Sequence, residues 1–203
     1  MTALLADASR PWSLRAELRA RTQAAHATVD AALWPYLAAG DDGYAKFLSA
    51  SAGALLPLER ELEAAGVARY VADWPERRRS AAVLADLASL GTPPPAPAAV
   101  PPVRSEAHAF GVLYTLEGSR LGARAVLPGV LASASARVRS AVRFLGHGEA
   151  RLWPDFLERL EASRAARRAP DEAVEGALAA FGAFERAARA VGEGTRIVMR
   201  HAG

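Results

Sequence analysis

The stretch that says most about the fold is GVLYTLEGSRLGAR, residues 111–124, a helix-forming run that carries three glycines. Each glycine inside a helix costs about 1 kcal/mol relative to alanine, which is abundant elsewhere in the chain. Gly118 and Gly122 are four residues apart and share one helix face, so they leave a patch of backbone without side chains. The spacing predicts that something flat or bulky lies against this patch, or that another helix packs closely there.

A second segment, residues 14–30, predicts an amphipathic helix that carries one histidine. At about 100° per residue its apolar positions form a core stripe, and His26 lies at the edge of that stripe. Arg15 and Arg19 fall on the same side as His26, about 16 Å and about 10 Å away along the helix axis. An imidazole that can bind iron, with arginines further along to meet carboxylates, suits haem. The alternative is a partly buried histidine that is only hydrogen-bonded. His108, His147 and His201 are competing candidates.

These two segments, in this order, resemble the haem oxygenase family, and most closely its bacterial, bacteriophytochrome-associated branch. The resemblance extends over residues 14–184, although only the two segments are specific. It implies an all-α, single-domain helical bundle in which His26 ligates the haem iron. It also implies that the glycine-bearing helix covers the opposite face of the haem, where oxygen binds.

The resemblance assigns catalytic roles to Gly118, Ser119 and Gly122. The two glycines match the family's Gly-x-x-x-Gly segment, which leaves room over the haem and steers bound oxygen toward one ring edge. Many members place an aspartate directly after the first glycine to organise water, and this chain has Ser119 instead. A hydroxyl offers one donor and two acceptor sites but no charge, so an aspartate-based proton relay is in doubt. The bacteriophytochrome-associated branch also favours serine there.

Other haem contacts follow from the same resemblance. Arg15, Arg19 and Arg151 are expected to meet the propionates, and Tyr114, one turn before Gly118, is expected to reach a propionate or distal water. Tyr114 could equally be an ordinary core tyrosine. Trp153 and Phe156 are expected either to line the pocket or to belong to the hydrophobic core. Arg120 and Arg124 are expected to be exposed. Glu117 is expected to be solvated or salt-bridged.

The implied function is oxidative cleavage of haem to biliverdin, with release of iron and carbon monoxide. The reaction would use O2 and external electrons from ferredoxin or a flavin reductase, and biliverdin would pass to a bacteriophytochrome. Two alternatives stay open. One is a non-enzymatic haem-binding or sensor protein of the same fold, which Ser119 keeps in play. The other is a helical scaffold without a cofactor, in which Gly118 and Gly122 serve close packing.

Composition narrows the class of protein. The chain has 203 residues, 51% hydrophobic and 23% charged, which is typical of one globular domain spanning residues 1–203. It has no cysteine, so disulfides and thiolate ligands are excluded. A net charge of +3 without a concentrated basic stripe argues against nucleic acid, and the arginine run at residues 77–79 is interpreted as a solvated helix face. With no signal peptide and no membrane-spanning run, we expect a cytoplasmic location.

Helix-forming residues dominate and strand patterns are absent. Residues 91–102 hold six prolines and predict a stiff surface loop rather than a domain linker. Pro57 is expected to kink or split its helix. We expect residues 1–11 and 192–203 to be flexible, with residues 197–199 able to dock. The expected helices cover residues 12–33, 42–65, 75–90, 103–126, 133–145, 149–167 and 171–191.

Overall fold

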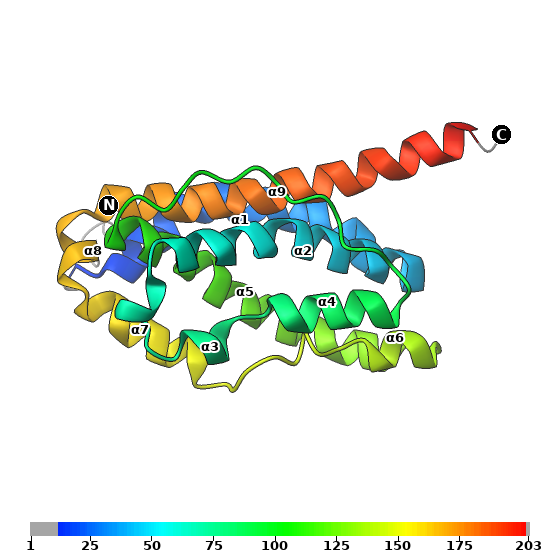
Figure 1. Ribbon diagram of the computed structural model, residues 1–203, viewed down its shortest axis with the longest axis horizontal. Coiled ribbons are helices and arrows are strands. Elements are labelled where there is room, and N and C mark those ends of the chain that lie inside the picture. The colour runs from blue at the N-terminus through cyan, green and yellow to red at the C-terminus, as the bar shows by residue number, and fades with distance from the viewer. Residues whose placement is uncertain (1–11, 202–203) are drawn as a thin grey trace, which may run out of the picture.

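The computed structural model describes residues 12–201, with side chains described through residue 193, and this part of the chain is helical without strands (Figure 1). The all-α fold class is therefore confirmed. A short 3-10 turn, Val67–Arg69, follows the second helix. The α-helices are α1 (Leu14–Ala38), α2 (Gly40–Ala64), α3 (Trp74–Arg77), α4 (Ser80–Ser89), α5 (Glu106–Leu131), α6 (Ala136–Ser140), α7 (Leu152–Ala162), α8 (Arg164–Arg168) and α9 (Pro170–His201).

The long helix α9 is central to the bundle, because α1, α2 and α5 all pack against it. Helices α1, α5 and α9 begin at the same end of the protein (Figure 1). Hydrogen bonds tie that end together: the Leu14 amide donates to Glu161 over 3.2 Å, and the Ser163 hydroxyl donates to Glu106 over 2.9 Å. The starting points of α1 and α5 are thus fixed relative to each other.

The crossing of α5 over α9 depends on two glycines. A side chain at Gly111 would run into the backbone carbonyl of Ala173, and one at Gly176 would run into the carbonyl of His108. Each glycine therefore lets the opposite backbone approach closely. The Thr115 hydroxyl adds a hydrogen bond to the Ala177 carbonyl at 3.2 Å.

The first two helices differ from expectation at their prolines. Helix α1 continues through Pro35 to Ala38, and α2 is not split at Pro57. Both prolines sit in helices that pack against α9, and tertiary packing outweighs the one backbone hydrogen bond that a proline removes. The end of α2 is as predicted: Gly66 follows it with a φ of +74°, which favours glycine.

The single helix predicted over residues 75–90 is wrong, since the chain forms α3 and α4 with a break at Arg78–Arg79. Glu59 of α2 explains the break. Its carboxylate accepts from the backbone N–H groups of Arg79 and Ser80, at 2.8 and 3.1 Å. A buried acceptor has thus taken two backbone donors at the start of α4.

The proline-rich segment, residues 91–102, lies extended over α2 and α9 (Figure 1). The Ala98 N–H donates to the Gly53 carbonyl at 2.8 Å, and Arg186 donates to the Ala99 carbonyl at 2.8 Å. Residues 98 and 99 of the segment are therefore held on α2 and α9.

The remaining boundaries also shift. The helix expected over residues 133–145 shortens to α6, because residues 141–151 form turns, and the one expected over 149–167 divides into α7 and α8 at Ser163. Ser163 caps α8 by accepting from the Ala166 N–H. The expectation for residues 1–11 lies outside the described residues, as does the docking of side chains at residues 197–199. Among the described helices, none is long and apolar enough to cross a membrane.

Candidate functional site

The face of α5 at Gly118 and Gly122 is open. A methyl group at Gly122 would have no neighbour within 4 Å, and one at Gly118 would meet only the ring edge of Trp153, at 3.7 Å. Leu121 beside them is 49% exposed. Close helix packing therefore explains Gly111 but not Gly118 or Gly122. The alternative of a cofactor-free scaffold depended on close packing at Gly118 and Gly122, which the structure does not show.

His26 lies exposed on α1, with 62% of its side chain accessible. Its ring packs edge-on against Phe181 of α9, with 5.6 Å between ring centroids. Its Nδ1 is 3.0 Å from the Asp30 carboxylate one turn later. When Nδ1–H donates to Asp30, the lone pair of Nε2 is left free to bind a metal. We had not predicted a role for Asp30, although a carboxylate four residues after a histidine is a recognisable signal.

Arg15 and Arg19 of α1 lie near enough to Tyr114 of α5 for their charges to affect the pKa of its hydroxyl. Burial raises the pKa of Tyr114, and the positive charges of both arginines act in the opposite direction. Both arginines are exposed, and neither guanidinium forms an ion pair or hydrogen bond with another described side chain. The structure thus brings three of the predicted site residues close together.

His26 and the turn of α5 that leads into the open face contact the same stretch of α9. His26 lies seven residues beyond Arg19, which is about 10 Å of helix, while Gly118 and Gly122 lie about 6 and 12 Å beyond Tyr114. Helices α1 and α5 start at the same end and run in the same general direction (Figure 1). His26 packs against Phe181 of α9, and Thr115, three residues before Gly118, bonds to Ala177, one turn before Phe181.

The aromatic residues of α7 divide into two groups. Trp153 is half-buried, packs at 5.8 Å from the Tyr114 ring and lies beside Gly118, so it lines the open face. Phe156 is fully buried and belongs to the core. Arg151 is exposed and pairs with Glu149 at 2.7 Å and with Asp155 at 3.6 Å. The structure does not bring Arg151 together with Arg15 and Arg19.

A buried network of arginines lies behind α5, and it corrects two expectations. Arg77 is fully buried rather than solvated, and it pairs with Glu117 at 2.9 Å. Arg120 is also buried rather than exposed; it pairs with Glu117 at 2.9 Å and donates to the Arg77 carbonyl. Sequence reasoning placed these charges at the surface because unpaired arginines rarely enter a core, whereas here their partners come from distant segments.

Ser119 follows Gly118 on α5 and is half-buried. A hydrogen bond connects it to Arg79, a third buried arginine. The Ser119 hydroxyl accepts from Arg79 Nη2 at 2.6 Å and donates to the Leu116 carbonyl at 2.7 Å. Arg79 is 2% exposed, and its guanidinium lies over the Phe144 ring at 4.9 Å. Burial, and then the charge of Arg120, lower the pKa of Arg79 to about 10, so it stays protonated at neutral pH.

The competing histidines lie in different surroundings. His108 is buried under α9, and burial lowers its pKa. His147 is half-buried in a turn beside Arg120, and burial followed by the charge of Arg120 lowers its pKa. The side chain of His201 lies outside the described residues. Among the described histidines, His26 is the exposed one.

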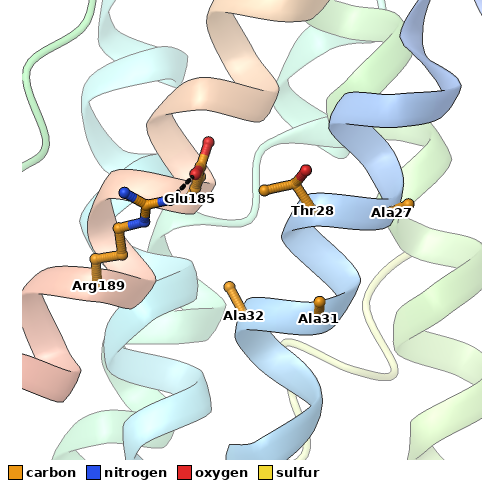
Figure 2. Close-up of a pocket in the computed structure, with 6 residues that line it drawn as sticks. All are labelled: Ala27, Thr28, Ala31, Ala32, Glu185 and Arg189. Atoms are coloured by element: carbon orange, nitrogen blue, oxygen red, sulfur yellow. Dashed lines mark hydrogen bonds and ion pairs between the residues drawn. The ribbon is translucent and has the colours of Figure 1, made fainter.

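A separate open groove lies between α1 and α9 (Figure 2). On a helical wheel its α1 residues centre on the side opposite His26. The Glu185–Arg189 ion pair, at 2.5 Å, lies along its other wall. The groove is lined by Ala27, Thr28, Ala31, Ala32, Glu185 and Arg189.

Comparison with known proteins shows the family of the chain. A family model described as "Heme oxygenase" matches residues 12–190. A "Heme oxygenase" of Xanthomonas campestris pv. campestris (strain 8004) is 34% identical over 145 residues, covering 70% of this chain and 87% of the relative. The crystal structure of the NO- and CO-bound heme oxygenase from Neisseria meningitidis shares the fold, with a TM-score of 0.71, 24% identity, and coverage of 89% of this chain and 92% of that one. On these matches, the chain belongs to the heme oxygenase family.

Proposed function

We propose that this protein binds haem between α1 and α5 and cleaves it oxidatively to biliverdin, with His26 as the iron ligand. Family membership supports the haem oxygenase activity. The single observation that carries the placement is the open face at Gly118 and Gly122: a methyl group at Gly122 would have no neighbour within 4 Å, and one at Gly118 would meet only Trp153. A flat macrocycle fits such a face, because the missing side chains let it approach the backbone.

The residues present fit the group. The Asp30 carboxylate holds Nδ1 of His26 and leaves Nε2 available. Arg15 and Arg19 offer two guanidinium groups without carboxylate partners in the described chain, which suits the two propionates. Tyr114 and Trp153 give the pocket an aromatic wall beside Gly118. Arg151, which has two carboxylate partners, is the weakest of the proposed propionate contacts.

Haem, when bound, supplies the iron that activates oxygen and is itself the molecule that is opened, with release of iron and carbon monoxide. The chain contributes orientation. His26 would hold the iron, and the backbone at Gly118 and Gly122 would leave room for the macrocycle and limit the space over it. Ser119 offers a hydroxyl for hydrogen bonding at the edge of that space.

The remaining partners are inferred from the family resemblance. We propose ferredoxin or a flavin reductase as the electron donor and a bacteriophytochrome as the acceptor of biliverdin. Membership of the bacteriophytochrome-associated branch stays a prediction.

The function is tested by adding ascorbate in air to the haem-loaded protein, with catalase present to remove free peroxide. Loss of the Soret band with growth of a broad red bilin band is the expected result. A stable Soret band under ascorbate and under a ferredoxin system would instead identify a non-enzymatic haem-binding protein.

His26→Ala tests whether His26 is the iron ligand. It should raise the Kd for ferric haem at least about tenfold, as measured by titration of the Soret band. His147→Ala is the matched control and should retain the wild-type spectrum. Loss of the spectrum in the control, with retention in His26→Ala, would move the ligand to His147.

A further inference from the structure

Ser119 has most of its hydrogen-bonding capacity already in use. A hydroxyl has one donor and two acceptor sites. The donor goes to the Leu116 carbonyl at 2.7 Å, and Arg79 Nη2 occupies one acceptor site at 2.6 Å. The second acceptor site has no partner in the described chain. Ser119 can therefore still accept one hydrogen bond, whereas its own proton is donated within the helix.

Arg79 differs from the other buried arginines in its surroundings. Arg77 and Arg120 both pair with Glu117. The guanidinium of Arg79 has no carboxylate within ion-pair distance in the described chain; its partners are the Leu116 carbonyl, the Ser119 hydroxyl and the Phe144 ring. Its Nη1 is buried and has no hydrogen-bond partner in the described chain. A buried donor of this kind calls for an explanation, because leaving it unpaired is costly.

Nη1 and the free acceptor site of Ser119 lie on neighbouring groups. Nη1 belongs to the same planar guanidinium as the Nη2 that binds Ser119. The pair therefore offers one donor and one acceptor side by side. A single water meets both needs, since it accepts from one partner and donates to the other.

We propose that Arg79 is a positioning residue of the haem site: Nη2 fixes the Ser119 hydroxyl as an acceptor, and Nη1 holds a buried water beside it. This inference rests on the proposed function. The water accepts from Nη1, donates one proton to Ser119 and keeps its second proton for the open face. A carboxylate at position 119 would accept hydrogen bonds, so the Arg79–Ser119 pair gives this site the opposite, donating polarity.

The test uses fluoride binding to the ferric haem-loaded protein, followed by its absorption spectrum. Bound fluoride accepts hydrogen bonds, and a donor that is itself held by a cation is strengthened. Arg79→Met should raise the Kd for fluoride at least about tenfold, and Ser119→Ala about threefold. Arg79→Lys, which keeps the charge but cannot bridge Ser119 and Leu116, should fall between wild type and Arg79→Met. The matched control is Arg124→Met, which removes the same charge from the outer part of α5 and should stay within twofold of wild type.

Circular dichroism melting checks that each variant is folded. If Arg79→Met does not fold, Arg79→Lys and Ser119→Ala decide the question. A folded Arg79 variant with wild-type fluoride affinity, or an equal loss in Arg124→Met, overturns the proposal. A wild-type chain that acquires no Soret band would instead overturn the proposed function, so the two failures are distinguishable.

Discussion

Two glycines of α5 have different physical reasons to be glycine, and single substitutions separate them. Gly111 faces the α9 backbone at Ala173, so Gly111→Ala forces the helices apart and should lower the free energy of unfolding by about 1–3 kcal/mol. Gly122 faces open space, so Gly122→Ala should raise the free energy of unfolding of the haem-free protein by about 0.5–1 kcal/mol. Urea unfolding of the haem-free protein measures both changes.

A larger side chain at Gly122 should weaken haem binding, although alanine there stabilises the haem-free protein. Gly122→Leu should weaken haem binding at least about tenfold, because a side chain enters the space that the macrocycle needs. Gly129→Leu, further along α5 and also without neighbours within 4 Å, is the control. Unimpaired haem affinity in Gly122→Leu would contradict the placement of haem against this face.

Local sequence patterns single out some of the candidate site residues. His26, Gly118 and Gly122 stand out by their spacing within one helix each. Asp30 was within reach of the same reasoning, because it lies one turn from His26. Arg79 was not, since its partner Ser119 lies 40 residues away, and nothing local distinguishes a buried arginine from a solvated one.

At the scale of elements, helix identity was predictable and helix interruption was not. Periodicity and composition indicated helices over nearly the correct stretches, and Ser105 and Gly66 mark the start of α5 and the end of α2. The break between α3 and α4 depends on Glu59, a tertiary partner about twenty residues earlier. The hydrogen bonds from the backbone N–H groups of Arg79 and Ser80 to Glu59 outweigh the helix propensity of that stretch.

The ion pairs of Asp73, which connect the start of α3 to α7, should make the free energy of unfolding depend on pH. Burial alone would raise the pKa of Asp73, but hydrogen bonds from Arg77 and Arg159 outweigh it and lower that pKa well below the usual range. A lowered pKa in the folded state means stability that is present above the unfolded pKa of about 4 and is lost as pH falls through the folded value. Asp73→Asn should therefore cost about 2 kcal/mol at pH 7, and less as the pH falls below about 4.

Urea unfolding at several pH values measures this difference. Asp171→Asn, which removes a surface carboxylate paired with Arg21, is the control and should leave the pH dependence unchanged. An Asp73→Asn deficit that stays constant down to pH 2 would mean that the carboxylate acts through packing rather than through its charge.

At the scale of the molecule, α1 and α5 are held by α9, which both helices contact over the same region. Phe181 packs against His26, and Ala177, one turn earlier, accepts from Thr115. Haem should therefore bridge two helices whose spacing α9 already sets. Hydrogen exchange should show haem-dependent protection at residues 22–30 and 118–126, with little change at residues 173–184, which are packed in both states.

Haem bound in the groove of Figure 2 would give a different exchange pattern, because that groove lies between α1 and α9, on the side of α1 opposite His26. Haem bound there would protect residues 27–32 together with 185–189 and leave residues 118–126 unchanged. Such a pattern would contradict the placement between α1 and α5 even if the protein were active. Protection confined to α1 and α5 would instead mean that α9 sets the spacing between the two helices that bind haem. Substitutions at the Gly111–Ala173 crossing should then change the haem affinity, although neither residue contacts haem.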